Sequence, residues 1–374
     1  MKKSYCGAAL LFVFHFTHPL ALFEEFNELT WVIPHVSIAN LPTPVHRLPH
    51  LEEALHHAPI FIKRDDLTGS NGLYGGNKVR KLEFLLGDAL QNNATKIIIF
   101  GCVGTNHGLA TACYARQLGF DCLLMLKHQP NSWVVQQNLL LDHYFKADIR
   151  LFKNNEERWV ALETLLENDT DAYFFPTGGS VALGAVGYVN AALELKHQID
   201  AGDMPMPNTI YLPVGSCGTT AGLLLGFKIA GIPSTLKAVA VEPEETPNEF
   251  YENTKKLFTE ANQLLHEALP SIPLYEFPET QLAINKDFCG QEYGLWLPEG
   301  DQATEIMYET EGITLEGTYS AKPVAALIAD IQNGLLSDHE VALVWNTYCG
   351  LDFSALTANV QYKELPSEVH HYFE

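Results

Sequence analysis

Short apolar runs alternate with helical patterns along most of the chain from Lys96 onward. Residues 96–100 read Lys-Ile-Ile-Ile-Phe, which is too short and too apolar for a surface helix and predicts a buried strand. Just before them, apolar residues recur at helical spacing and predict an amphipathic helix: Leu82, Leu85, Leu86, Ala89 and Leu90. This alternation is typical of βαβ units built around a parallel sheet.

The same pattern predicts a series of strands and helices as far as residue 345. The expected strands are 96–100, 121–127, 148–153, 172–175, 209–214, 236–241 and 340–345. The expected helices are 106–118, 132–144, 155–167, 182–199, 219–229, 248–267, 301–311 and 322–332. Glycine and prolines at 202–207 mark the expected crossing between two domains.

Three cations crowd the start of the helix that begins after Gly75-Gly76, namely Lys78, Arg80 and Lys81. A helix N-terminus carries partial positive charge, so a cation there costs from a few tenths to about 1 kcal/mol. An anionic ligand held at the turn would compensate, because glycine loops and helix N-termini bind phosphate.

Composition describes an ordinary globular protein and narrows the possible partners. The chain has 374 residues, of which 47% are hydrophobic, and 45 acidic against 23 basic residues give a net charge of −22. No basic patch is evident that could bind nucleic acid or an anionic membrane, so neither is expected as a partner. No run of about 18 apolar residues is present, so a membrane span is not expected.

Cysteine usage and the N-terminus bear on the compartment. Seven cysteines occur without a C-x-x-C pair, which favours neither a disulfide framework nor a metal site. Residues 1–22 have the outline of a secretory signal, but His15 and His18 interrupt its apolar run and no clear cleavage site follows. We therefore expect a cytoplasmic protein, with secretion as the alternative.

Three turns rich in small residues follow predicted strands. The most specific is Gly215-Ser216-Cys217-Gly218-Thr219-Thr220, where backbone N–H groups, two threonine hydroxyls and a helix start converge in a way that suits a phosphate. The others are 101–107 and 176–180. Each could also be a plain strand-to-helix connection or a helix cap. All three follow the carboxyl ends of strands, where open α/β sheets bind ligands.

A lysine beside a bound phosphate suits imine formation with a carbonyl. A phosphate-bearing aldehyde cofactor of this kind is pyridoxal 5'-phosphate, whose ring accepts electrons from carbanions. Lys78 is the candidate for this lysine, and the alternative is a solvated cation at a helix start.

The residues around Lys78 resemble a known family. Residues 63–69 (Lys-Arg-Asp-Asp-Leu-Thr-Gly) and 75–83 (Gly-Gly-Asn-Lys-Val-Arg-Lys-Leu-Glu) are similar to the signature of fold-type II pyridoxal-phosphate enzymes of the aminocyclopropane-carboxylate deaminase and D-cysteine desulfhydrase family. Residues 36–44 resemble the entry segment of that family, and the likeness runs to about Leu351. It implies a two-domain α/β fold like that of the tryptophan synthase beta subunit, with open, mostly parallel sheets flanked by helices.

The resemblance also implies roles for particular residues. Lys78 would hold the cofactor and move a substrate proton, Asn106 would bind the ring oxygen, and Lys81 would assist a phosphate cup at 215–220. Thr105, with Asn106 and His107, would hold the substrate carboxylate. Tyr293 and Tyr319 match active-site phenols of the family, and Thr347 would be the neutral partner of the pyridine nitrogen.

Three departures from the family pattern bear on the substrate. The deaminase branch has Glu after its second tyrosine and the desulfhydrase branch has Thr, whereas this chain has Ser320, which we count among the cofactor contacts. A hydroxyl facing the ring nitrogen would leave it unprotonated, which suits β-elimination. Gly104 stands where the family has Gln, and Tyr348-Cys349 replaces Gly-Gly.

These residues predict a pyridoxal-phosphate lyase that releases a 2-oxo acid, ammonia and sulfide from D-cysteine or a related small amino acid. The alternatives are aminocyclopropane-carboxylate deamination, β-replacement or racemisation, and a binding protein with little catalysis. We expect a larger cofactor-binding domain of residues 25–81 and 190–374, a smaller domain of 82–189 and an N-terminal extension of 1–24. The family likeness implies a homodimer.

Overall fold

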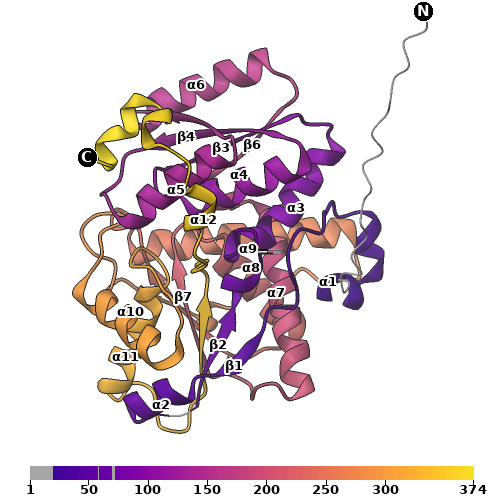
Figure 1. Cartoon of the computed structure of the whole chain (residues 1–374). Helices are drawn as coiled ribbons and strands as arrows, with labels where there is room; N and C mark the ends of the chain where they lie inside the picture. The colour runs from indigo at the N-terminus through magenta and orange to yellow at the C-terminus, as the bar shows by residue number, and fades with distance from the viewer. Residues whose placement is uncertain (1–19, 58, 70–71) are drawn as a thin grey trace, which may run out of the picture.

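Two sheets organise the computed structural model, which describes residues 20–57, 59–69 and 72–374 (Figure 1). The larger sheet has six strands in the order β1-β2-β10-β7-β8-β9, and only β1 runs antiparallel to its neighbour. Its strands are β1 (Val45–Arg47), β2 (Ile60–Arg64), β10 (Ala342–Asn346), β7 (Thr209–Val214), β8 (Thr235–Ala240) and β9 (Leu282–Asn285). The central strands β7 and β10 are buried, as parallel strands covered on both faces must be.

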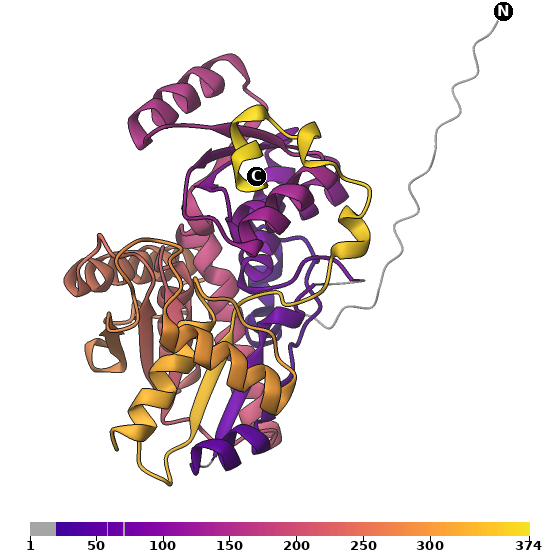
Figure 2. The ribbon, with the colours of Figure 1, turned by 60° about the vertical axis from the view of Figure 1, so that its left-hand side comes forward.

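The smaller sheet has four parallel strands in the order β5-β4-β3-β6. They are β5 (Asp148–Leu151), β4 (Asp121–Lys127), β3 (Lys96–Cys102) and β6 (Ala172–Phe175). The two sheets form the lower and upper bodies of the molecule in Figures 1 and 2.

Helices cover both faces of each sheet. One core of the larger sheet contains residues of α1 (Ala21–Glu25), α7 (Ala182–Ala201), α8 (Gly218–Ala230) and α9 (Pro247–Ala268), and the other contains residues of α2 (Pro49–Leu55), α10 (Pro298–Glu311) and α11 (Ala321–Gln332). The smaller sheet packs against α3 (Asn77–Gln91), α4 (Asn106–Leu118) and α5 (Trp133–Tyr144) on one face and α6 (Asn155–Asn168) on the other. The remaining α-helix is α12 (Ser354–Thr357).

Helices α7 and α8 approach each other closely at two glycines of α8. A Cβ atom built at Gly222 would come within 2.2 Å of the Ala185 carbonyl oxygen, and one at Gly226 within 2.3 Å of the Ala192 Cβ. The two glycines therefore let the helix backbones approach, which fixes the start of α8 relative to α7.

The structure confirms the predicted α/β architecture with open, mostly parallel sheets flanked by helices. Every strand and helix predicted from 96 to 345 is present, and most bounds agree within a few residues. Strands β1, β2 and β9 were not predicted. They are short, and β1 and β9 lie at the edges of the sheet, where their apolar pattern is weak.

The expected domain bounds stay a proposal, and packing at both ends of the chain differs from them. Residues 20–23 belong to the core of the larger sheet, and the Leu22 backbone N–H donates to the Asn190 side chain at 3.0 Å. At the other end, Phe353, Val369 and Tyr372 pack in the core of the smaller sheet. Figures 1 and 2 both place this C-terminal segment beside α5, which packs on the smaller sheet.

The expected secretory outline at residues 1–22 lies mostly outside the described residues. Within the described part of the chain, no helix is both long enough and apolar enough to cross a membrane.

Candidate active site

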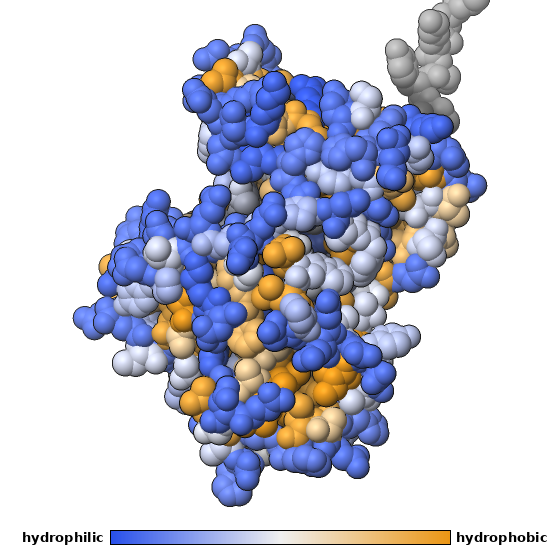
Figure 3. Space-filling view, turned by 90° about the vertical axis from the view of Figure 1, so that its left-hand side faces the viewer, coloured by the Kyte–Doolittle hydropathy of each residue, from blue (hydrophilic) through white to orange (hydrophobic). Residues whose placement is uncertain are grey.

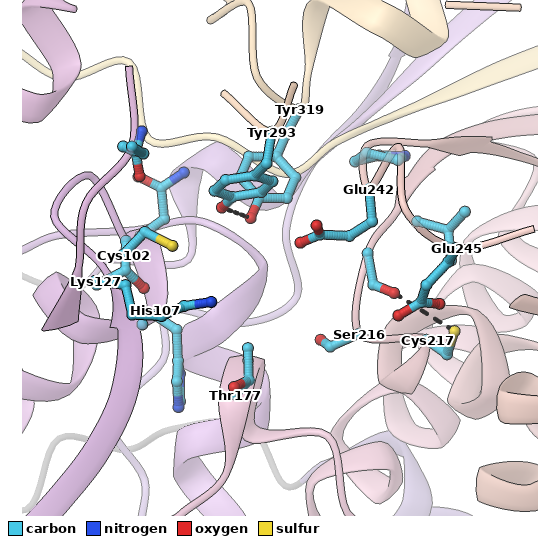
Figure 4. A pocket seen from close by; sticks show the side chains of 18 of the residues that line it. Cys102, His107, Lys127, Thr177, Ser216, Cys217, Glu242, Glu245, Tyr293 and Tyr319 are labelled. Atoms are coloured by element: carbon cyan, nitrogen blue, oxygen red, sulfur yellow. Dashed lines mark hydrogen bonds between the residues drawn. The ribbon is translucent and has the colours of Figure 1, made fainter. Parts of the chain in front are cut away.

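A cavity of about 680 Å³ lies between the two sheets. Its wall comes from the start of α3 and from the loops that follow β3, β4, β6, β7 and β8 at their carboxyl ends. Figure 4 shows Cys102, Lys127 and His107 on one side and Ser216, Cys217 and Glu242 on the other. The three predicted glycine turns do meet here, which is the usual position of a ligand site in an open α/β fold.

Lys78 lies in the first turn of α3 and lines this cavity. The helix start is fixed from two sides, because the Gly76 N–H donates to the Asp65 carbonyl at 2.9 Å and the Asn77 N–H to the Thr347 carbonyl at 3.0 Å. Burial lowers the pKa of Lys78 to about 8. A substantial fraction of neutral amine is therefore present near physiological pH, as a nucleophile or general base requires.

The other two cations of the helix start point elsewhere. Arg80 is fully buried and pairs with Asp65 at 2.7 Å and Glu194 at 2.8 Å. Lys81 does not line the cavity; its ammonium donates to the Gly178 carbonyl at 3.1 Å and the Ser180 hydroxyl at 3.0 Å. The cluster of cations in the sequence therefore separates into three environments, and only Lys78 faces the cavity.

The loop 215–220 forms a cradle at the start of α8, and all six residues line the cavity. Cys217 adopts the left-handed conformation, with φ of 62°, and makes no side-chain cap, so the N–H groups of Thr219 and Thr220 are left for a ligand. The buried hydroxyl of Thr220 has no hydrogen-bond partner among the described residues. This unpaired donor, the helix start and Lys81 behind the loop fit a bound phosphate group.

The facing turn completes the cradle. The Ser180 hydroxyl lies 2.7 Å from that of Ser216 and accepts from the Gly218 N–H at 3.3 Å. A Cβ at Gly178, whose φ is 66°, would come within 2.2 Å of the Ser216 hydroxyl oxygen. A side chain at this position would therefore displace the serine that shapes the loop.

Thr105, Asn106 and His107 line the wall opposite this loop. The Asn106 side-chain oxygen accepts from the Tyr74 hydroxyl at 3.0 Å and from Asn138 at 3.2 Å, so its amide nitrogen is the group left to donate to a ligand. The Thr105 hydroxyl caps α4 by accepting from the Gly108 N–H at 3.1 Å.

His107 is buried, and neither ring nitrogen has a partner among the described residues. Burial first, and then the charges of Lys78 and Lys81, lower the pKa of His107 well below its usual value. The ring is therefore neutral and offers a ligand one hydrogen-bond donor and one acceptor.

Tyr293 and Tyr319 form a pair on the wall between the two sides (Figure 4). Their hydroxyls are hydrogen-bonded to each other, and the rings meet edge to face at 76°. Burial raises the pKa of both phenols, so both are protonated at neutral pH.

The structure separates the two hydroxyl residues expected near the ring nitrogen. Thr347 lines the cavity. Ser320 does not, because its hydroxyl accepts from the Glu316 N–H at 2.9 Å at the start of α11. The predicted cofactor contacts of Ser320 and Lys81 stay predictions, and neither residue belongs to the cavity wall.

Several lining residues carried no signal in the motifs. They include Lys127, Gln129, Glu242 and Glu245, which lie outside the three predicted turns. Gln129 explains one departure from the family pattern, because its side-chain nitrogen lies 2.7 Å from a Cβ built at Gly104, and its oxygen accepts from the Gly104 N–H at 3.1 Å. A glutamine from the next loop thus occupies the space beside Gly104. The position of these residues after strands was the one available clue.

Comparison with known proteins agrees with this geometry. The profile of the family described as pyridoxal-phosphate dependent enzymes matches residues 36–347. The chain belongs to this family. Its cofactor is pyridoxal phosphate, and the residues predicted to hold its phosphate, ring oxygen and aldehyde line one cavity: the loop 215–220, Asn106 and Lys78.

Two curated relatives are similar over most of their length. D-cysteine desulfhydrase from Serratia proteamaculans is 31% identical over 310 residues, covering 79% of this chain and 87% of the relative. D-cysteine desulfhydrase from Klebsiella pneumoniae is 32% identical over 322 residues, covering 84% and 93%.

Solved structures confirm the fold. An aminocyclopropane-carboxylate (ACC) deaminase homologue superposes with a TM-score of 0.72 at 28% identity, covering 89% of this chain and 96% of its own. A fungal L-serine ammonia-lyase from Rhizomucor miehei reaches 0.57 at 17% identity, covering 88% and 98%, and shows the shared fold alone. The fold-type II architecture expected from the motifs is therefore confirmed.

Proposed function

We propose that the protein is a lyase that eliminates the β-substituent of D-cysteine, or of a related small amino acid, and releases a 2-oxo acid, ammonia and sulfide. The observation that carries the proposal is the position of Lys78. Its amine, with a pKa of about 8, shares one cavity with a phosphate cradle and a pair of neutral phenols. The relatives named D-cysteine desulfhydrase support the choice of substrate.

Each side chain of the cavity has a role that follows from its position. Asn106 and His107 present backbone N–H groups at the start of α4, and Thr105 adds its side chain, where a substrate carboxylate would be favoured by the helix N-terminus. The neutral Lys78 amine removes the proton from Cα. Bound pyridoxal phosphate supplies an electron sink that stabilises the resulting carbanion. The phenols of Tyr293 and Tyr319 are the proton donors available to the leaving group.

The wall beside Thr347 favours elimination over more demanding carbanion chemistry. Thr347 supplies a hydroxyl and no negative charge to a ring nitrogen placed there. With a hydroxyl beside its nitrogen, the ring would be a weaker electron sink than with a carboxylate there. A weak electron sink is sufficient for elimination, because a thiolate departs quickly from the β-carbon.

ACC deamination is a second candidate, because the solved structure with a TM-score of 0.72 is titled as an ACC deaminase homologue. Ser320 argues against it, since the deaminase branch has Glu at this position. A cofactor-binding protein with little catalysis is a third candidate, suggested by the altered Gly104. Gln129 fills the space at Gly104, which favours an intact site.

A substrate panel tests these candidates with the purified, cofactor-loaded protein. D-cysteine, β-chloro-D-alanine, D-serine, L-cysteine and ACC are each assayed for 2-oxo acid release. We expect release from D-cysteine and β-chloro-D-alanine in the wild type, none in Lys78→Ala, and full activity in the control Lys256→Ala, whose side chain is 73% exposed on α9. Release from ACC alone, or from no substrate, would refute the proposal.

We further propose a cytoplasmic homodimer. Cys102, Cys113, Cys122, Cys217, Cys289 and Cys349 are all free, which suits a reducing compartment. Figure 3 shows apolar residues gathered on the lower part of the face that carries α10 and α11. Among the large hydrophobic side chains that are exposed, Tyr308 belongs to α10 and Leu335 follows α11. Such a patch is typical of a protein interface. Light scattering tests the state: a mass near 83 kDa, twice the chain mass of 41.6 kDa, is expected, and a monomer would refute the dimer.

A further inference from the structure

Glu242 lies in the loop that follows β8 and is a cavity residue to which the proposed function assigns no role. Figure 4 shows its carboxylate extending into the cavity on the side of Tyr293 and Tyr319. The side chain is half-buried, and neither a hydrogen bond nor an ion pair joins it to another described residue. It is therefore an acid held in the site without a structural partner.

The surroundings of Glu242 make it a weak acid. Burial is the main cause that raises its pKa to about 7, and the neighbouring charges of Glu245 and Glu244 add to this. Lys127 from β4 and Lys322 from α11 act in the opposite direction. The charge of Glu242 in turn raises the pKa values of four neighbouring groups, which are Cys102, Cys289, Tyr293 and Tyr319. Close to neutral pH, Glu242 is thus present in both protonation states.

The two phenols need such an acid if one of them protonates a leaving group. Burial raises their pKa values, so a phenolate left between them is costly and must be reprotonated before the next turnover. His107 cannot do this, because its lowered pKa keeps it neutral. Lys78 is engaged at Cα. Four carboxylic acids line the cavity, namely Glu242, Glu244, Glu245 and Glu292, and Glu242 is the one whose charge acts on both phenols.

We propose that Glu242 is the proton reservoir of the tyrosine pair and that the site is built for β-substituents that leave as bases, such as thiolate or hydroxide. This inference rests on the proposed β-elimination. As the Cβ–S bond breaks, the thiolate leaves with the electron pair and takes the hydroxyl proton of one tyrosine. The hydrogen bond between the phenols passes the second proton to the phenolate. The Glu242 carboxylic acid then returns a proton to the pair, and solvent at the cavity mouth reprotonates Glu242.

The test compares two leaving groups in Glu242→Gln, which keeps the shape of the side chain and removes its acid. Chloride needs no proton when it leaves β-chloro-D-alanine, whereas the thiolate of D-cysteine does. A general acid contributes about 100-fold or more to a rate, so we expect kcat for D-cysteine to fall at least about 10-fold and kcat for β-chloro-D-alanine to fall less than about 3-fold. The wild-type decline of kcat for D-cysteine as pH rises through about 7 should disappear in Glu242→Gln and return in Glu242→Asp.

Thermal unfolding gives a readout that needs no substrate. Because the pKa of Glu242 is raised in the folded state, its contribution to stability is lost as pH rises from about 4.5 to about 7. The difference in Tm between the wild type and Glu242→Gln should therefore decrease over this range. The difference between the wild type and the control Glu252→Gln, an exposed change on α9, should stay constant.

Equal losses with both substrates, or a pH profile that survives in Glu242→Gln, would overturn the proton reservoir and leave the β-elimination intact. Absence of a 2-oxo acid from both substrates in the wild type would instead overturn the proposed function and the reservoir with it.

Discussion

Removal of the Lys78 amine should stabilise the cofactor-free protein while it abolishes activity. Burial lowers the pKa of this amine from 10.5 to about 8. One pKa unit corresponds to about 1.4 kcal/mol, so the charged amine costs the folded apo-protein roughly 3 kcal/mol at pH 7. Lys78→Met, which keeps most of the length of the side chain and removes its charge, should raise the free energy of unfolding by up to this amount.

The pH dependence gives this prediction its sign. Between about pH 8 and 10.5 the unfolded chain binds the Lys78 proton and the folded chain does not, so the stability of the wild type rises with pH in this window. The advantage of Lys78→Met should be largest below pH 8 and shrink by about 1.4 kcal/mol for each pH unit above it. Differences between wild type and variant cancel the titration of the other lysines.

Urea unfolding of the apo-proteins at several pH values measures both effects. Lys256→Met serves as the control, because its side chain is 73% exposed and should change stability by less than about 0.5 kcal/mol at any pH. If Lys78→Met is no more stable than the wild type at pH 7, or if its advantage does not change between pH 7 and 10, the proposed cost of the charged Lys78 amine is refuted.

Three further changes test the supports of the site. Arg80→Met removes the guanidinium that pairs with the buried carboxylates of Asp65 and Glu194, so it should cost about 3–5 kcal/mol in urea unfolding. The control Arg150→Met breaks an exposed pair and should cost less than about 1 kcal/mol, and similar costs for the two variants would contradict the buried network. Gly178→Ala places a Cβ 2.2 Å from the Ser216 hydroxyl oxygen and should displace this serine from the phosphate cradle. Cofactor affinity in a fluorescence titration should therefore fall at least about 10-fold, and unchanged affinity would argue against a cradle at 215–220. Gln129→Ala opens the wall beside Gly104, so KM for D-cysteine should rise more than kcat falls; a change in kcat alone would place this residue in the chemistry.

Local periodicity predicted the fold where strands and helices were long. The helix at 106–118 has the predicted bounds because its apolar face, its Thr105 cap and the glycine that ends it act within a few residues. Strand β1, of three residues, and β9, of four, are too short for such a pattern. Their places in the sheet depend on pairing with strands far along the chain, as β2 and β10 also show.

The site was predictable where a motif carries its own geometry. The loop at 215–220 and Lys78 belong to local strand–turn–helix signals. The destination of Arg80 was not predictable, because its partner Glu194 lies 114 residues away and only the folded chain brings them together. A motif also gives the position of a residue without the direction of its side chain. Ser320 follows Tyr319 in the sequence, but its hydroxyl accepts from the Glu316 N–H and lies outside the cavity wall.

Gln129 and Glu242 are two further cavity residues that no local motif could identify. Gln129 reaches Gly104 across 25 residues, and Glu242 shares the wall with Tyr319 from a different strand end. Strand ends predicted where polar side chains would gather, but the choice among them required the folded structure.

Location of the covalent cofactor link tests the central claim most directly. The purified yellow protein is reduced with borohydride, digested and mapped by mass spectrometry. We predict a single pyridoxyl modification on Lys78, absent from Lys78→Ala. A modification on another lysine, or none after the protein has been loaded with pyridoxal phosphate, would contradict the account.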